Sequence, residues 1–244
     1  GDFVFDDDGD DDGCGDFGCP PPPPTDCGGY WDTTGLGNNT EMCEAINWVT
    51  EENIFTGYAD GSYRPYNYIN RAEVLKVVLN AFDNMVILPL DGTNQGFQDV
   101  DAHAWYMPYV RTAKFYAMLQ GYPDGQAKLG NHINRVEFLK FVLEAAESFA
   151  GYNIPNYGFS NYADVQVGSW YSNYAGVAYD YMLFNEYVYN GQYNLQPADL
   201  VQRGEVALLL YRMHVNGLLN GTSNGLPVDG GYGYYDNMGV PLYY

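Results

Sequence analysis

The chain has 244 residues, enough to bury a real core, and a formal net charge of −21 at pH 7. So large an acidic excess repels phosphate backbones and anionic lipid surfaces, so we expect no nucleic-acid partner. No apolar run approaches the ~20 residues that a membrane-spanning helix needs, so no membrane insertion is expected either.

Residues 1–40 are predicted to form an extended, acidic, Cys- and Pro-rich N-terminal arm. Within it, the carboxylates of Asp8, Asp10 and Asp12 alternate and a Gly follows them. This pattern resembles the start of a calcium-binding loop, in which alternate oxygens wrap a hard cation. The twelfth position of such a loop is Cys19 rather than Glu, which excludes a complete EF-hand. Calcium binding and a solvated acidic run are the two interpretations.

The four cysteines all lie in the first 43 residues, in a segment too rich in Asp, Gly and Pro to build its own core. They are Cys14, Cys19, Cys27 and Cys43. Two disulfides, with three possible pairings, would fix this segment and place the protein outside the cytoplasm. A zinc site is the rival interpretation, but the cluster has no CxxC and no nearby histidine. Two sequons for N-glycosylation fit exposed loops of an extracellular protein, beginning at Asn38 and Asn220.

Tyrosine is abundant, at 25 residues, whereas lysine and arginine together number 10. Aromatic surfaces with few lysines suit carbohydrate stacking or extensive protein contacts. A tyrosine-rich core with hydroxyl groups at its edge has the same composition, so both interpretations stay open.

No group of residues predicts catalysis. His103, His132 and His214 are scattered without metal-ligand spacing, and no Ser, Cys or Thr lies in a nucleophile motif. The chain is therefore predicted not to be an enzyme.

The most informative pattern is a five-residue string that occurs three times, with its arginines 64 and 68 residues apart. The copies are Ile69-Asn70-Arg71-Ala72-Glu73, Ile133-Asn134-Arg135-Val136-Glu137 and Val201-Gln202-Arg203-Gly204-Glu205. Each copy opens an apolar stretch with helical spacing and follows an amphipathic segment and a tight turn. A repeated unit defines the fold, so the chain is predicted to be mainly α, with three helix-turn-helix units.

The units are assigned to residues 41–95, 96–158 and 159–216. Their first helices are expected over Glu41–Glu52, Trp105–Leu119 and Trp170–Phe184. Their turns are expected at 58–61, 122–125 and 189–191, where Asp-Gly or Asn-Gly tolerates a positive φ. Residues 217–244 are rich in Gly and Tyr and have no helical period, so they are predicted to form an extended C-terminal arm.

Helix capping explains most of the repeated string. Asn70 followed by Glu73 is a capping box, Asn134 with Glu137 repeats it, and Gln202 is a weaker N-cap. The arginine is not explained in this way, because a cation at the positive end of a helix is unfavourable by ~0.3–1 kcal/mol. Two compensating partners are open: a carboxylate from a neighbouring unit, such as Asp99 or Asp164, or an anionic ligand held by the guanidinium fork.

The strings resemble the I-T-R-A-E motif of S-layer homology (SLH) repeats, and further motifs support the resemblance. Gly57-Tyr58-Ala59-Asp60-Gly61 and Gly121-Tyr122-Pro123-Asp124-Gly125 match its turn. Phe97-Gln98-Asp99-Val100 and Tyr162-Ala163-Asp164-Val165 match its opening. The chain departs from the pattern where Thr is replaced by Asn, Asn and Gln. The third unit also lacks the G-Y-x-D-G turn, and the first shows no F-x-D-V opening.

The resemblance implies a pseudo-threefold bundle whose grooves between repeats bind cell-wall polysaccharide, often through a pyruvylated amino sugar. It implies that Arg71, Arg135 and Arg203 each meet an acidic sugar substituent. Aromatic side chains would line the grooves: Trp48, Trp105, Trp170, Tyr58 and Tyr122.

Two functions follow for an extracellular protein of the cell surface. The first is a structural protein that self-assembles into a surface layer or filament through its terminal arms and its repeats, so that its partners are other copies of itself. The alternative is a cell-wall anchoring module that binds acidic polysaccharide in the grooves.

Overall fold

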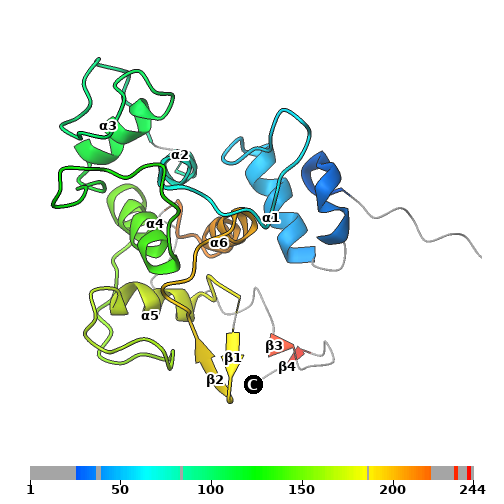
Figure 1. Ribbon diagram of the computed structural model, residues 1–244. Helices are drawn as coiled ribbons and strands as arrows, with labels where there is room; N and C mark the ends of the chain where they lie inside the picture. The colour runs from blue at the N-terminus through cyan, green and yellow to red at the C-terminus, as the bar shows by residue number, and fades with distance from the viewer. Residues whose placement is uncertain are drawn as a thin grey trace, which may run out of the picture.

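The computed structural model describes residues 26–36, 40–82, 85–185 and 187–220, and the backbone of 234–235 and 241–242. The predicted calcium ligands Asp8, Asp10 and Asp12, the cysteines Cys14 and Cys19, and the sequon at Asn38 lie outside these residues. The described chain is mainly helical, as predicted (Figure 1). Its α-helices are α1 (Thr40–Glu51), α2 (Arg71–Asn80), α3 (Met107–Phe115), α4 (Arg135–Ala150), α5 (Ser172–Asp180) and α6 (Arg203–Val215).

The repeated string begins α2, α4 and α6, and the predicted capping boxes are present. Asn70 Oδ1 accepts from the Glu73 N–H at 2.9 Å, and a Glu73 carboxylate oxygen accepts from the Asn70 N–H at 3.0 Å. The pair at the start of α4 does the same at 2.9 and 3.3 Å. At α6 the Glu205 carboxylate accepts from the N–H of Gln202 at 2.9 Å.

The first two N–H groups of these three helices are satisfied by segments distant in sequence. At α2, the Arg71 and Ala72 N–H groups donate to the carbonyls of Asn131 and Leu129, at 3.0 and 3.1 Å. The first two N–H groups of α4 bind the carbonyls of Asp199 and Pro197, and those of α6 bind the carbonyls of Asn67 and Pro65. Each helix start is therefore joined to a different part of the chain by the same pair of hydrogen bonds.

The helices pack as three pairs, with α3 against α2, α5 against α4, and α1 against α6. Figure 1 shows α2, α4 and α6 towards the middle, with the other three helices outside them. The α1–α6 pair brings together the two ends of the helical region. Arg212 of α6 holds both carboxylate oxygens of Glu41 at 2.7 Å, and Trp48 of α1 stacks on the His214 ring at 4.5 Å between centroids.

Two of the first helices are shorter than predicted, because the chain leaves the helix at residues in the left-handed region. Helix α3 ends at Phe115, and Ala117 follows with φ 59°. Helix α5 ends at Asp180, and Met182 follows with φ 48°. The backbone N–H after each of these residues donates to a carbonyl of the last helical turn, as in a Schellman motif.

The third predicted turn is a β-hairpin. Strands β1 (Tyr187–Tyr189) and β2 (Gln192–Asn194) pair antiparallel around Asn190 and Gly191, with φ 52° and 74°. In the predicted C-terminal arm, β3 (Tyr234–Tyr235) pairs with β4 (Pro241–Leu242). None of the helices in the described parts of the chain is long and apolar enough to cross a membrane.

A disulfide joins Cys27 to Cys43, with their Cα atoms 5.0 Å apart. It fixes two short 3-10 helices, η1 (Cys27–Gly29) and η2 (Trp31–Leu36), to α1. One bond of the predicted disulfide framework is thus present. In the part of the chain that the structure describes, no cluster of metal-ligating side chains occurs.

Candidate functional site

The three repeated arginines lie at the starts of α2, α4 and α6, and each contacts a carbonyl far along the chain. Arg71 Nε donates to the Ala127 carbonyl at 3.3 Å, and an Arg135 terminal nitrogen donates to that of Leu195 at 2.8 Å. Arg203 Nε donates to the Tyr63 carbonyl at 2.8 Å. The relative exposure of Arg71 is 7% and that of Arg203 is 3%, so these cations are largely withdrawn from water.

Asp99 and Asp164, the carboxylates named as examples in one of the two open interpretations of the arginines, have other partners. Asp99 accepts from the N–H groups of Ala127 and Lys128, both at 2.8 Å. Asp164 accepts in the same way from Leu195 and Gln196, at 2.8 and 2.7 Å. These two Asp residues therefore do not pair with the arginines, because two backbone N–H groups occupy each carboxylate; the carboxylate from a neighbouring unit that does pair, with Arg135, is that of Glu205.

An equivalent Asp, which the sequence did not reveal, lies in the segment before the first predicted unit and contacts that unit. Asp32 accepts from the N–H groups of Tyr63 and Arg64 at 2.8 and 2.7 Å. The string Tyr30-Trp31-Asp32 therefore does what the F-x-D-V string does elsewhere. Tyr30 packs where a Cβ on Gly57 would lie, as Phe97 does at Gly121.

In all three copies the second N–H belongs to a non-glycine residue in the left-handed region. These residues have φ values of 58°, 52° and 56° and are Arg64, Lys128 and Gln196. Such a conformation is unfavourable for a residue with a Cβ. A carboxylate that binds two successive N–H groups offsets this cost, because charge-assisted hydrogen bonds are stronger than neutral ones.

The three arginines differ in their carboxylate partners. Arg135 forms an ion pair with Glu205 at 2.5 Å and also binds the Gln196 side chain. Arg71 lies 4.0 Å from Glu137, too far for a hydrogen bond. Among the described residues Arg203 has no ion pair within 4.0 Å, and its guanidinium lies over aromatic rings.

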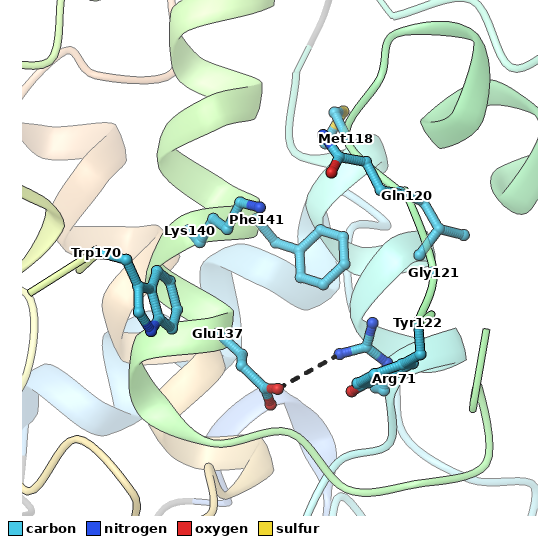
Figure 2. A pocket seen from close by; sticks show the side chains of 10 residues that line it. Arg71, Met118, Gln120, Gly121, Tyr122, Glu137, Lys140, Phe141 and Trp170 are labelled. Carbon is cyan, nitrogen blue, oxygen red and sulfur yellow. Dashed lines mark ion pairs between the residues drawn. The ribbon is translucent and has the colours of Figure 1, made fainter. Parts of the chain in front are cut away.

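A pocket of about 240 Å³ opens at Arg71. Figure 2 shows Arg71 and Tyr122 on one side and Trp170 on the other, with Glu137 and Phe141 between them. Segment 118–122, the first two turns of α4 and the residue two positions before α5 contribute to it. The charged and aromatic residues that line it are Arg71, Tyr122, Glu137, Lys140, Phe141 and Trp170. With Arg71 of α2, residues from four segments thus meet at one site.

The charge and exposure of this pocket suit an anion attached to a sugar ring. Arg71 and Lys140 supply two cations and Glu137 one anion, in a chain that is otherwise strongly acidic. The Trp170 ring is 59% exposed and offers a flat apolar surface. Arg71 lies 5.2 Å from the Tyr122 ring centroid. A guanidinium fork beside an open indole face can bind a carboxylate and the sugar that carries it.

Lys128 and Asp124 flank the Tyr122 side of the pocket. Their side chains are 2.8 Å apart, and this hydrogen bond raises the pKa of the Lys128 ammonium and lowers the pKa of the Asp124 carboxyl. On the α4 side, burial raises the pKa of Glu144, which lies 3.8 Å from Lys140. Among the described residues, the Lys140 ammonium therefore has only this long contact with the Glu144 carboxylate.

The other predicted groove residues are placed differently. Trp105 is 57% exposed and contacts Tyr106, and Trp48 packs against α6 through His214. Tyr58 lies beneath Arg203, with 4.6 Å from the guanidinium carbon to the ring centroid. Sequence reasoning missed Glu137 and Lys140 as pocket residues. Their signal was present, because Lys140 follows the capping Glu137 by three residues and so shares its helix face.

Comparison with known proteins gives the class of the domain. Residues 38–75, which include α1 and the start of α2 with Arg71, match the family model "S-layer homology domain". The chain therefore contains an S-layer homology domain, as predicted.

Three related proteins have names that refer to anchoring or to the cell surface. The chain is 31% identical over 152 residues to "Cellulosome-anchoring protein" of Acetivibrio thermocellus, a match that covers 61% of this chain and 32% of the relative. It is 25% identical over 170 residues to "Surface-layer 125 kDa protein" of Lysinibacillus sphaericus, covering 69% of this chain and 14% of the relative. It is 27% identical over 180 residues to "Cell surface glycoprotein 1" of A. thermocellus, covering 70% and 7%.

The chain thus spans a third or less of the length of these relatives. The matched domain and the relatives indicate an extracellular protein of the cell surface.

Proposed function

We propose that this chain is a non-enzymatic anchoring module that binds an acidic cell-wall polysaccharide in the pocket at Arg71. The observation that carries the proposal is the state of the Arg71 guanidinium. Its Nε is hydrogen-bonded and its guanidinium carbon lies 5.2 and 5.4 Å from the ring centroids of Tyr122 and Phe141. In the described structure its terminal nitrogens have no hydrogen-bonded partner, and their carboxylate contact is the 4.0 Å one with Glu137. An anion that enters the pocket can therefore bind these nitrogens without displacing a hydrogen-bonded carboxylate.

The comparison with the other two arginines supports a single open site. The guanidinium of Arg135 is engaged by Leu195, Gln196 and Glu205, so a ligand would have to replace an existing ion pair. Arg203 donates to the carbonyls of Tyr63 and Thr56 and is covered by aromatic rings. Arg71 is thus the primary ligand-binding arginine of this proposal, and Arg135 and Arg203 are secondary candidates.

The proposal includes three SLH-like repeats in a pseudo-threefold bundle, over 41–95, 96–158 and 159–216. The hydrogen bonds that recur at the starts of α2, α4 and α6 support it, as do the three helix pairs. Residues 26–36 would belong to the first repeat, because Asp32 supplies the contact that Asp99 and Asp164 supply in the others.

The proposed ligand is a saccharide with a carboxylate substituent, such as a pyruvylated amino sugar. Its carboxylate would meet Arg71 and Lys140, and its ring would stack on Trp170. The local excess of one positive charge acts at short range, and salt screens the net charge of the chain over ~8 Å. The name of the first relative, an anchoring protein, agrees with this role.

A pull-down on purified cell-wall polysaccharide tests the proposal. We expect the full chain to be retained by native polysaccharide. It should not be retained by polysaccharide from which mild acid has first removed the pyruvyl ketals. Arg71→Gln should abolish retention, and Arg135→Gln, a matched control in the second copy of the string, should retain most of it. Equal retention of wild type and Arg71→Gln would contradict the proposal.

Self-assembly into a surface layer is the second candidate, and the β1–β2 hairpin favours it. Tyr187, Val188 and Tyr189 are 47%, 55% and 63% exposed on a two-stranded sheet. The Tyr193 carbonyl of β2 already accepts from the Ala163 N–H at 2.8 Å, so the edge that could pair is that of β1. Edges of this kind pair with strands of other chains. Electron microscopy of the isolated protein decides between the candidates, because a monodisperse monomer in the presence and absence of calcium excludes assembly.

A further inference from the structure

We propose that Asp99 is a positioning residue for ligand binding, which acts on Arg71 through Ala127. The inference rests on the proposed function of the Arg71 pocket. Asp99 does not line the pocket, but its carboxylate fixes the residue whose carbonyl holds Arg71.

Ala127 is the shared residue of this arrangement. Its N–H donates to Asp99 Oδ1 at 2.8 Å, and its carbonyl accepts from Arg71 Nε at 3.3 Å. The side chain of Ala127 is fully buried, so the residue has no solvent-facing alternative position. The Asp99 carboxylate therefore determines where the acceptor for Arg71 lies.

The hydrogen bond to Nε matters because a guanidinium is planar. When Nε is bound to a fixed carbonyl, the plane of the fork and the direction of both terminal nitrogens are set. In Figure 2 one of these nitrogens points across the pocket towards Glu137, where the ion pair is drawn. Loss of the Ala127 contact would let the long side chain rotate, and a ligand would then have to restore its orientation on binding.

A related arrangement recurs twice, which gives internal controls. In the third unit Asp164 binds the N–H of Leu195, whose carbonyl accepts from a terminal nitrogen of Arg135 rather than from its Nε. In the first unit Asp32 binds the N–H of Tyr63, whose carbonyl accepts from Arg203. Each shared residue thus joins an Asp of its own unit to an arginine from another unit.

The residue after Ala127 makes the dependence on Asp99 stronger. Lys128 has φ 52°, and its N–H donates to Asp99 Oδ2 at 2.8 Å. An Asn at position 99 keeps the shape but presents an N–H₂ group to one of these two donors and has no charge. The turn that carries the Ala127 carbonyl would then lose one hydrogen bond and part of its support for the left-handed backbone.

Calorimetric titration of the full chain with a synthetic pyruvylated amino-sugar glycoside tests the inference. We expect Asp99→Asn to weaken binding about tenfold, the effect of one lost charge-assisted hydrogen bond. The matched control Asp164→Asn makes the same backbone change beside Arg135 and should leave binding within about twofold of wild type. Equal loss in both variants, or none in Asp99→Asn, would overturn the inference.

A second readout separates this inference from the proposed function. The Arg71 Nε–H resonance should be protected from exchange with solvent in wild type and in Asp164→Asn, and unprotected in Asp99→Asn, without any ligand. If wild type does not bind the glycoside, the proposed function fails, and this resonance alone decides whether Asp99 positions Arg71. If Asp99→Asn does not fold, Asp99→Ser, which keeps one acceptor, replaces it in both measurements. Protection that persists in the folded position-99 variant overturns the inference.

Discussion

Asp99 and Arg71 bind the N–H and the carbonyl of the same residue, Ala127, although neither is close to it in sequence. Asp99 lies in the opening of its unit, and Arg71 lies at the start of α2. A carboxylate and a guanidinium that would attract each other directly are thus held apart by a backbone residue. As a result, the Asp99 carboxylate accepts hydrogen bonds from backbone N–H groups, and the terminal nitrogens of Arg71 are left to bind a ligand in the pocket.

Helix ends provide a test of the backbone geometry. Ala117 follows α3 with φ 59° and is exposed, whereas Gly151 follows α4 with φ 68° and has open space where a Cβ would lie. We expect Ala117→Gly to raise the free energy of unfolding and Gly151→Ala to lower it, each by about 1 kcal/mol. Chemical denaturation of the two variants measures both changes. Shifts of the same sign would contradict the assignment of left-handed ends.

Gly121 links the turn to the pocket. A Cβ at this position would lie 2.5 Å from the Phe97 ring and 3.0 Å from the Gln126 carbonyl, and φ is +78°. Gly121→Ala should therefore lower the free energy of unfolding by about 2 kcal/mol or more and displace Phe97. Gly130→Ala is the matched control, because a Cβ there meets nothing within 4 Å. A thermal melt that is as low for Gly130→Ala as for Gly121→Ala would show that the close approach is not the cause.

The disulfide between Cys27 and Cys43 closes a loop with a sequence separation of 16 residues. The double variant Cys27→Ala, Cys43→Ala should lose about 3 kcal/mol of stability, mainly because the unfolded chain is no longer constrained. Since Asp32 lies in the segment that this bond fixes, protection of the Arg203 Nε–H should also fall. Unchanged stability in denaturant would contradict the expected contribution of this bond.

Asp60 gives a prediction for acidic pH. Hydrogen bonds from the Ser62 hydroxyl and backbone N–H, and from Arg64, lower the pKa of Asp60 from 3.8 to about 2. The folded-state pKa lies below the unfolded value, so this stabilisation is present above pH 3.8 and is lost as the pH falls towards 2. A carbon-detected NMR titration should find a midpoint near 2 in wild type and a higher one in Ser62→Ala. A wild-type midpoint at 3.8 would refute the assignment.

The helical architecture could be predicted because capping boxes and apolar spacing act locally. Asn70 with Glu73 marks the start of α2 without any knowledge of tertiary structure. The ends of α3 and α5 could not be placed in this way, because Ala117 and Met182 are not glycines and nothing in the sequence marks a left-handed end. Tertiary packing imposes that conformation.

The candidate site was predictable only in part. The repeated arginine pointed to it, but the partners depend on which units become neighbours, and composition does not specify that. Asp32 escaped detection because Tyr30-Trp31-Asp32-Thr33 has Thr where the F-x-D-V string has Val, and because it lies in the segment predicted to be an arm. The difference between Arg71 and Arg135 could not be predicted from the sequence either. Each arginine faces the capping Glu of the next copy of the string, but the ion-pair distance is 4.0 Å for Arg71 and 2.5 Å for Arg135.

The central claim is that one of three similar arginines is open to ligand. Calorimetric titration with the pyruvylated glycoside tests it most directly, in wild type, Arg71→Gln and Arg135→Gln. We expect one high-affinity site per chain in wild type, weakened about 10- to 100-fold in Arg71→Gln and unchanged in Arg135→Gln. Full binding by Arg71→Gln, or an equal loss in Arg135→Gln, would contradict it.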